Sequence, residues 1–412
     1  MTDLLYLVHR IPYPPNKGDK IRSFHLLAHL ARRHRVHLGA FVDDPADWAH
    51  APALSEWVKG ELCLLPLDRR RALLRSLTGF VTGEPVTLPW YRDRRMQRWV
   101  DARLAAGVDR VLVYSSSMAP YVLARSGVRR VIDFVDMDSD KWRQYAASRA
   151  WPVSALYRRE ARRLFAFERK VALTFDAATF VSEAEAALFR RLAPESAGHV
   201  SAFSNGVDTD YFSPAAAGAN PYPAGTRALV FTGAMDYWAN VDAVSWFASE
   251  VWPGLYRRHP GSAFYIVGAR PVPAVEALGR QPGVVVTGGV PDVRPWLAHA
   301  AAAVAPLRIA RGIQNKVLEA MAMARATVVS PQALEGIRAR PGEELLVADG
   351  AGEFLARCGE LLDDPARAAE VGRRARARVL ADYAWAVHLA RVDALLEGAS
   401  AVTLSPTLEA HA

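Results

Sequence analysis

Residues 303–330 of the chain read AVAPLRIARGIQNKVLEAMAMARATVVS, and this stretch predicts a strand, a tight turn, a helix and a second strand. The segment 303–307 is short and apolar, and 327–329 is a β-branched run suited to a buried strand. From Gln314 onward, apolar residues recur at helical spacing. Gly312 precedes that helix, where its backbone freedom suits a sharp turn. The stretch therefore predicts a parallel α/β domain.

The turn and the start of the helix also predict a nucleotide-binding site. A helix N-terminus presents unpaired backbone N–H groups that attract anions, and Arg308, Arg311 and Lys316 add positive charge nearby. Glu319 follows one turn into the helix, with Asn315 on the adjacent turn. Its carboxylate can accept two hydrogen bonds from a ribose diol. The alternative for this segment is a buried amphipathic helix with one exposed glutamate.

Length and composition limit the classes of protein that fit this sequence. The 412 residues predict two domains of ordinary size. Cys63 and Cys358 are the only cysteines, which gives neither a disulfide framework nor zinc-ligand spacing. No apolar run approaches the ~18–20 residues of a membrane span, and the run 4–8 is too short for a signal peptide. We expect a cytoplasmic protein that holds no metal.

The excess of positive over negative charge lies in the first half of the chain. Residues 1–205 carry 32 Lys and Arg against 22 Asp and Glu, whereas the remainder carries 19 against 21. The arginine clusters 69–71, 92–98 and 158–163 favour contact with anionic headgroups at the inner face of a membrane, at ~1 kcal/mol per residue. Simple solvation of arginine-rich helix faces explains them equally well. Nucleic acid is not expected, because no groove-reading motif accompanies the charge.

The N-terminus predicts a second βαβ unit. A buried strand at 4–8 leads into a proline-rich loop at 10–20 that contains Gly18 and Asp19, followed by a helix at 21–33 and a strand at 36–42. Further strands at 62–66, 111–114, 131–135 and 178–181 complete the first predicted sheet. The second predicted sheet has strands at 228–233, 264–267 and 284–287 in addition to those of the opening stretch, and the chain is helical at 354–397 with an interruption at 383–385.

The motif NKVLEAMA at 315–322, followed by TVVS, resembles the donor-binding signature of family-4 GT-B glycosyltransferases. The longer run APLRIARGIQNKVLEAMAM is similar to the branch found beside bacterial exopolysaccharide and exosortase (PEP-CTERM) gene clusters. This resemblance implies an α/β fold of the GT-B class, with two Rossmann-like doubly wound domains facing each other across a cleft. Residues 1–208 and a returning helix at about 386–400 would form the acceptor-side domain, and residues 209–385 the nucleotide-sugar domain.

The resemblance also implies roles for individual residues. It places the sugar nucleotide on Gly18, Gly233, Arg308, Gly312, Ile313, Asn315 and Glu319, the catalytic groups on Asp19, Arg311 and Lys316, and the acceptor on Ser116, Asp136 and Asp138. The family needs no obligatory metal and no cofactor, because the sugar nucleotide is itself the donor substrate.

The sequence departs from the family pattern at several positions. Arg311 stands where the family has the first of two glutamates, so either the backbone of Gly312 and Ile313 holds the sugar or the donor preference differs. The Arg and Lys expected after Gly233 are absent, which leaves Arg308, Arg311 and Lys316 to meet the phosphates. No histidine lies at 115–117. Asp136 and Asp138 either orient acceptor hydroxyls or, in the slightly favoured interpretation, cap a helix that starts near Lys141.

These features predict transfer of a hexose, with retention, from a nucleotide-diphosphate sugar to a growing, lipid-linked exopolysaccharide saccharide. The partners expected are the donor, a saccharide acceptor and an anionic membrane surface. A non-catalytic sugar-binding or nucleotide-binding scaffold and a nucleotide-sugar epimerase are the alternatives. A nicotinamide dehydrogenase is not expected, because no Gly-x-Gly-x-x-Gly follows the first strand.

Overall fold

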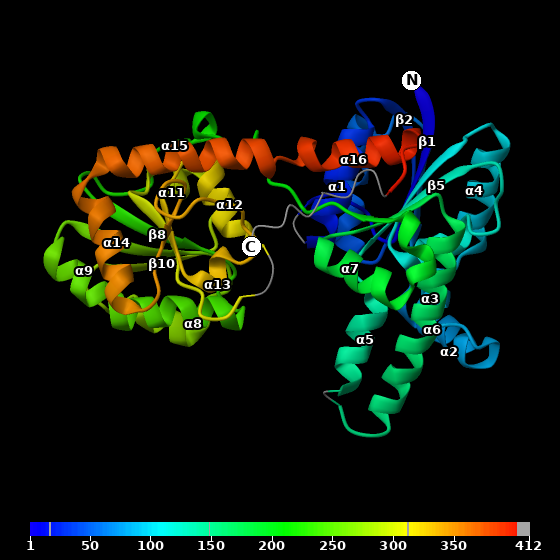
Figure 1. The fold of residues 1–412 in the computed structure, drawn as a ribbon, viewed down its shortest axis with the longest axis horizontal. Helices are drawn as coiled ribbons and strands as arrows, with labels where there is room; N and C mark the ends of the chain where they lie inside the picture. The colour runs from blue at the N-terminus through cyan, green and yellow to red at the C-terminus, as the bar shows by residue number, and fades with distance from the viewer. Residues whose placement is uncertain (16–17, 148, 311–312, 402–412) are drawn as a thin grey trace. The chain divides into compact units, whose positions relative to one another are not determined.

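The computed structural model describes residues 1–15, 18–147, 149–310 and 313–401, which fold into two α/β units. Unit 1 comprises Met1–Asn205 and the chain from His388 onward, and unit 2 comprises Gly206–Val387. Each unit is built on its own parallel sheet, as the sequence predicts (Figure 1).

The sheet of unit 1 has seven parallel strands in the order β3-β2-β1-β4-β5-β6-β7. Its central strands are apolar on both faces, because helices cover the sheet on both sides. The strands are β1 (Thr2–Val8), β2 (His34–Val42), β3 (Leu62–Pro66), β4 (Arg110–Tyr114), β5 (Arg129–Val135), β6 (Ala177–Phe180) and β7 (Val200–Ala202).

The connections of unit 1 are mainly helical. They are α1 (Gly18–Leu30), α2 (Arg69–Thr82), α3 (Thr87–Trp90), α4 (Arg94–Ala105), α5 (Asp138–Ala147), α6 (Val153–Thr174) and α7 (Glu183–Leu192), with short 3₁₀ segments η1 (Pro45–Glu56), η2 (Ser116–Tyr121) and η3 (Pro194–His199). Helices α5 and α6 lie side by side and project beyond the sheet, with α2 next to α6 (Figure 1).

Unit 2 has six parallel strands in the order β10-β9-β8-β11-β12-β13. They are β8 (Arg227–Thr232), β9 (Ser262–Val267), β10 (Val284–Gly288), β11 (Ala302–Ala305), β12 (Thr327–Val329) and β13 (Leu346–Val347). The other elements are η4 (Pro214–Ala216), α8 (Trp238–Trp246), the π-helix η5 (Phe247–Val251), α9 (Trp252–Arg258), α10 (Pro273–Leu278), α11 (Arg294–His299), α12 (Asn315–Ala322), α13 (Pro331–Leu334), α14 (Ala351–Asp363) and α15 (Pro365–Asp382).

Both sheets reverse their strand order next to their first strand. β1 lies between β2 and β4, and β8 lies between β9 and β11. The loops that leave such neighbouring strands diverge to opposite faces of the sheet, so a crevice forms at the carboxyl ends of the strands. The topology therefore places the loops after β1 and β4 at one crevice, and the loops after β8 and β11 at another.

The last helix, α16 (Trp385–Glu397), follows an interruption at Tyr383 and Ala384. From His388 onward it belongs to unit 1 and packs on α1 and β5. His29 Nε2 lies 2.8 Å from Asp393 Oδ2, and Arg129 Nε donates to the Leu395 carbonyl oxygen at 2.6 Å.

Two helix starts differ from the sequence predictions. Helix α1 begins at Gly18 rather than at residue 21, so Asp19 lies in its first turn, where a negative charge stabilises the helix dipole. Helix α5 begins at Asp138 rather than near Lys141. Within the described ranges, no helix combines the length and the apolarity needed to cross a bilayer.

Candidate functional site

In unit 2, a glycine follows each of two neighbouring strands, Gly233 after β8 and Gly268 after β9. A Cβ on Gly268 would lie 1.6 Å from the Gly233 carbonyl oxygen, so the two backbones approach each other as only glycine allows. A Cβ on Gly233 would lie 2.7 Å from Asn240 Nδ2 and 3.0 Å from Lys316 Nζ. Exposed backbone, an amide and an ammonium group thus meet at the end of β8.

Two neighbours, Phe231 and Asn240, hold Lys316 at this point. It lies in the first turn of α12, and its Nζ sits 4.3 Å from the centre of the Phe231 ring and donates to Asn240 Oδ1. Asn240 Nδ2 in turn donates to the Ala234 carbonyl oxygen at 2.8 Å, which turns Oδ1 toward the lysine. Burial lowers the pKa of Lys316 to about 8, although the charge of Glu319 opposes the shift.

Glu319 lies one turn further along the same helix. Burial raises the pKa of its carboxyl to about 7, although the charge of Lys316 opposes the shift. Within the described part of the chain, the Glu319 carboxylate has no hydrogen bond or ion pair. The site therefore offers a cation beside bare backbone and, one helical turn away, a carboxylate that none of the described residues occupies as a hydrogen-bond donor.

Arg308 is the predicted donor-site residue that the structure pairs elsewhere. Its guanidinium forms two hydrogen bonds with Asp242 of α8, of which the bond from Nε measures 2.9 Å, and 54% of its side chain is exposed. Ile313 lies two residues before α12 and is half-buried. Asn315 is the first residue of α12 and is exposed. Arg311 and Gly312 lie outside the described residues.

In unit 1, the crevice between β1 and β4 contains His9, which the sequence analysis did not single out. Its ring stacks on Tyr114 with a centroid distance of 5.8 Å, and meets the edge of Tyr91 at 5.7 Å. Burial and then the charge of Arg10 lower the pKa of His9 to about 4, so the imidazole is neutral at pH 7. A histidine directly after the first strand of a doubly wound sheet was the available signal.

Asp19, predicted to be catalytic, holds Arg10. Arg10 Nη1 donates to Asp19 Oδ2 at 2.6 Å, and Arg10 Nε donates to Asp43 Oδ1 at 2.9 Å. His9 Nε2 lies 3.8 Å from the same oxygen of Asp19. The carboxylate thus positions its neighbours at the end of β1, and Gly18 is the first residue of the helix that carries it.

The predicted acceptor residues follow β4 and β5. Ser116 is buried, and its Oγ has no hydrogen-bond partner among the described residues. Lys141 Nζ lies 2.7 Å from Asp136 Oδ2 and 3.4 Å from Asp138 Oδ1. Burial raises the pKa of Asp138, against the opposing charge of Lys141.

The favoured interpretation of Asp136 and Asp138 as helix caps is therefore wrong. Carboxylates from other helices bind the amides at the start of α5: the N–H of Met137, the residue before α5, donates to Glu185 Oε2 at 2.8 Å, and the Ser139 N–H in the first turn donates to Glu168 Oε1 at 3.2 Å. These partners are 48 and 29 residues away in sequence, which is why local capping rules could not find them.

The predicted residues thus gather in separate places. Unit 2 brings together Gly233, Lys316 and Glu319, and leaves Arg308 paired with Asp242. Within unit 1, burial raises the pKa of Tyr91 to about 12, and the charges of Asp19 and Asp138 add to that shift.

Comparisons with known proteins agree with this geometry. Residues 226–364 match the family model described as glycosyl transferases group 1. The matched segment contains Gly233, Lys316 and Glu319. Among curated proteins, no sequence similarity is found.

Solved structures resemble nearly the whole chain. The sucrose-phosphate synthase of Thermosynechococcus elongatus is 18% identical with a TM-score of 0.61, covering 96% of this chain and 98% of that one. The Anabaena protein HepE, solved with UDP and glucose, is 12% identical with a TM-score of 0.60, covering 97% and 100%. WaaG, a glycosyltransferase involved in lipopolysaccharide biosynthesis, is 16% identical with a TM-score of 0.57, covering 96% and 100%.

At these identities the structural likeness concerns the fold, and the family match concerns one segment of unit 2. The predicted fold class is confirmed. The chain has the GT-B fold, and its residues 226–364 match the model of the group 1 glycosyl transferases.

Proposed function

We propose that this chain transfers a sugar from a nucleotide-diphosphate donor to a saccharide acceptor. The observation that carries the proposal is the arrangement of Lys316, the bare backbone at Gly233 and the open carboxylate of Glu319 at the reversal point of the second sheet. Ligands of doubly wound sheets bind at such points. HepE, which shares the fold, has been solved with UDP and with UDP-glucose.

The proposed donor lies with its diphosphate against Gly233 and Lys316. The first amides of α12 add partial positive charge to the lysine, as helix N-termini do. The ribose hydroxyls donate to Glu319, one turn along the helix. In this placement, the ammonium group of Lys316 binds the anionic diphosphate, and the carboxylate of Glu319 accepts hydrogen bonds from the ribose hydroxyls.

In the transfer step, the bond between the sugar C1 and the diphosphate oxygen breaks, an acceptor hydroxyl oxygen bonds to C1, and the proton of that hydroxyl passes to the departing diphosphate. Negative charge develops on the departing diphosphate. A fixed ammonium at Lys316 and the helix amides stabilise that charge in a partly dehydrated site, where electrostatic interactions are strong. Retention at C1 without a metal, which the resemblance to family 4 implies, is part of the proposal.

On the acceptor side, the proposal assigns Ser116, Asp136 and Asp138 of unit 1 to binding saccharide hydroxyls. Neutral His9 joins them by accepting a hydrogen bond from an acceptor hydroxyl group. Asp19 acts through Arg10 and His9 as a positioning residue. A lipid-linked exopolysaccharide acceptor and a location at the inner face of the membrane complete the proposed role.

Replacing Glu319 by alanine is expected to raise the KM for the donor by about 10- to 100-fold and to lower turnover, because hydrogen bonds to a charged group contribute ~1.5–3 kcal/mol. Calorimetric titration with UDP and GDP, followed by donor kinetics, measures the effect. Glu276→Ala removes an exposed glutamate from the same unit and is the matched control. Wild-type affinity in the Glu319 variant would contradict the proposed ribose contact.

The affinity for nucleotide is expected to peak between pH 7 and pH 8. Glu319 must lose its proton to accept from the ribose, and its pKa is about 7. Lys316 must keep its proton to meet the diphosphate, and its pKa is about 8. The UDP association constant, measured as a function of pH, should therefore decrease below pH 7 and above pH 8.

Glu319→Gln provides the control for this pH dependence, because its side chain does not ionise. In this variant, the UDP association constant should decrease less toward low pH, and the remaining decrease should be the part caused by protonation of the nucleotide's own phosphate. An unchanged acid limb in this variant would show that Glu319 does not set it.

A further inference from the structure

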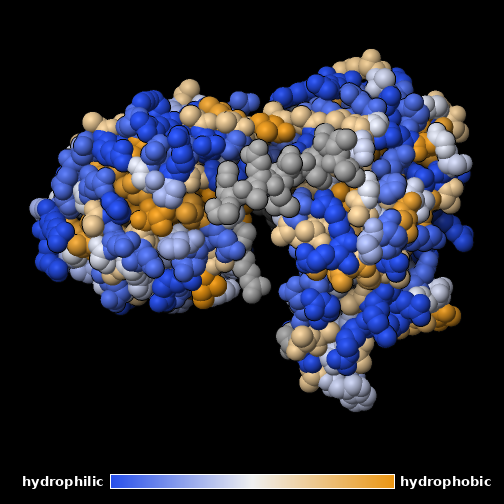
Figure 2. Space-filling view, viewed as in Figure 1, coloured by the Kyte–Doolittle hydropathy of each residue, from blue (hydrophilic) through white to orange (hydrophobic). Residues whose placement is uncertain are grey.

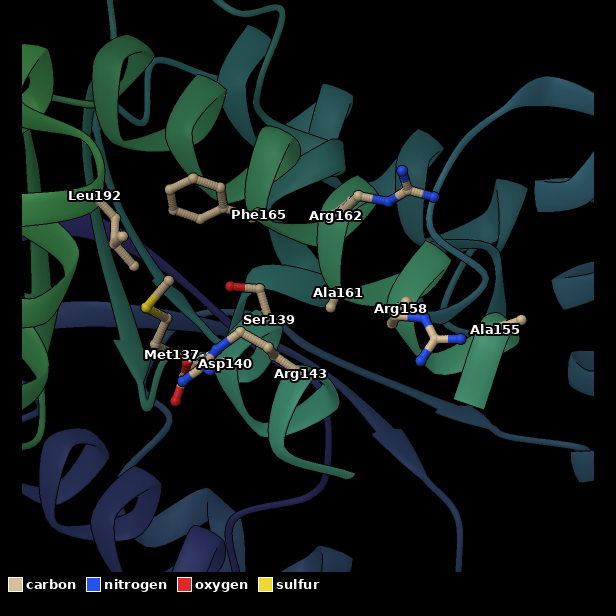
Figure 3. Close-up of a pocket in the computed structure, with 10 residues that line it drawn as sticks. All are labelled: Met137, Ser139, Asp140, Arg143, Ala155, Arg158, Ala161, Arg162, Phe165 and Leu192. Carbon is tan, nitrogen blue, oxygen red and sulfur yellow. Dashed lines mark hydrogen bonds and ion pairs between the residues drawn. The ribbon is translucent and has the colours of Figure 1, made fainter. Parts of the chain in front are cut away.

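Unit 1 contains a pocket of about 530 Å³ between α5, α6 and α7 that none of the roles above uses. Its volume lies within the range of small-molecule sites. Ser139 and Asp140 of α5 form one wall, and α6 forms the other from Ala155 to Phe165 (Figure 3). Leu192, the last residue of α7, closes the remaining side.

The two ends of the lining differ in their unpaired charge. In Figure 3, Met137, Phe165 and Leu192 lie toward one end of the drawn set, where Asp140 and Arg143 pair beside Met137, and Arg158 and Arg162 lie toward the other. Among the described residues, neither of these arginines has a carboxylate partner; Arg158 donates only to Ser154 Oγ, at 3.3 Å. The pocket thus joins an apolar end to two cations that lack a counter-ion.

The acidic groups near the pocket do not cancel this charge. Asp140 is neutralised by Arg143, whose Nε donates to it at 2.7 Å. Glu168, behind the wall, accepts from Ser139 Oγ at 2.5 Å. Burial raises the pKa of Glu168 to about 8, although that hydrogen bond opposes the shift, so the carboxyl is mostly protonated at pH 7. An anion at the arginine end meets a net positive charge.

The surroundings of the pocket are unusually apolar for a surface. Trp151, which precedes α6, is 80% exposed, and Leu156, beside the pocket residue Ala155, is 39% exposed. Helix α2 packs on α6 through Arg159, which donates to the Gly79 carbonyl oxygen at 2.6 Å. The exposed hydrophobic residues of α2 are Leu73, Leu74, Leu77, Phe80 and Val81.

The exposed residues of α2 recur at positions i, i+1, i+4, i+7 and i+8, which places them on one face of the helix. Figure 2 shows strongly hydrophobic residues gathered at the end of α2, in the lower right of the view. Arginines at 69–71 begin the same helix. An apolar face with basic residues beside it favours contact with an anionic lipid surface.

We propose that the pocket between α5, α6 and α7 binds the apolar chain of a single-chain lipid phosphate, with the phosphate at Arg158 and Arg162. A chain that leaves a bilayer beside α2 and Trp151 enters along α6 at Ala155 and ends against Met137, Phe165 and Leu192. This assignment goes beyond the transfer reaction proposed above and does not rest on it.

Binding of dodecyl phosphate to the full chain, measured by calorimetry below its micellar concentration and without nucleotide, tests the assignment. One molecule is expected to bind per chain. Inorganic phosphate should bind much more weakly because it lacks the alkyl chain, and dodecyltrimethylammonium should bind much more weakly because it lacks the anionic group. Arg158→Glu with Arg162→Glu should weaken binding by about tenfold or more, as expected from the loss of charge-assisted hydrogen bonds.

Two further variants separate the pocket from the general surface. Ala155→Trp fills the entrance from a half-buried position and should weaken binding to a similar degree, with unfolding followed separately to verify that the fold is kept. Arg163→Glu changes an exposed arginine of the same helix that does not line the pocket, and should leave binding unchanged. Equal losses in Arg163→Glu and in the Arg158 and Arg162 variant would overturn the proposal.

The remaining outcomes also decide. Equal binding of the cationic detergent would reduce the site to a plain apolar pocket. A different outcome is that phosphatidylglycerol vesicles displace dodecyl phosphate and that the Ala155→Trp chain still binds these vesicles. This result would show that the arginines bind phosphate at the bilayer surface and not in the pocket. UDP titration of the unaltered chain distinguishes the two proposals, because failure to bind dodecyl phosphate with intact UDP binding contradicts only this one.

Discussion

Replacement of Lys316 by methionine is expected to lower kcat by about 10²–10³-fold, the effect of removing one preorganised donor to developing negative charge. Methionine keeps the length and the apolar stem, so the contact with Phe231 survives while the ammonium is lost. The lowered pKa of about 8 marks a cation that is already partly dehydrated, and such a group interacts strongly with a diphosphate. Steady-state transfer from a nucleotide sugar measures the loss.

Lys170, exposed near the end of α6, provides the matched control for this substitution. Lys170→Met removes the same charge from the chain without touching unit 2, and should leave kcat and the donor KM unchanged. A Lys316→Met enzyme that kept normal kcat with only a raised KM would show that the lysine binds the ground state and the transition state equally, which would contradict its proposed catalytic role.

Replacement of Arg22 by methionine is expected to destabilise unit 1 by about 3–5 kcal/mol, because it leaves a buried carboxylate without a partner. Arg22 Nε donates to Asp133 Oδ2 at 2.7 Å, and both side chains are 1% exposed. The guanidinium also donates to Asn205 Oδ1 at 2.9 Å and lies 3.7 Å from the centre of the Phe203 ring. These contacts join α1, β5 and the chain that follows β7.

Denaturant unfolding followed by tryptophan fluorescence measures this loss, with the two units allowed separate transitions. Arg35→Met is the matched control, because it breaks an arginine–aspartate pair of similar geometry at the surface, where Arg35 is 55% exposed. That pair should contribute little. Similar small changes in both variants would contradict the structural role assigned to Arg22 and Asp133.

The helices and strands that the sequence predicts correctly are those marked by a local pattern of apolar residues. The β-branched run at Thr327–Val329 and the helical spacing from residue 315 correspond to β12 and α12 because burial on both sides demands apolar residues at those spacings. The start of α1 was placed too late because Gly18 and Asp19 look like loop residues, although Asp19 stabilises a first helical turn.

The candidate site was predictable where a motif is contiguous and not where partners come from distant parts of the chain. Glu319 and Lys316 lie in one short motif. Arg308 gave no sign that Asp242 pairs with it, because the two are 66 residues apart. His9 was passed over since a single histidine after a strand is common, and only its stacking on Tyr114 sets it apart.

The central claim is that a sugar nucleotide lies at the end of β8, with its diphosphate at Lys316 and its ribose at Glu319. A crystal structure of the chain with UDP tests it most directly. We predict diphosphate oxygens within hydrogen-bond distance of Lys316 Nζ and the Gly233 backbone, and a ribose hydroxyl on the Glu319 carboxylate. UDP bound with its ribose away from Glu319, or no UDP bound at saturating concentration, would contradict the claim.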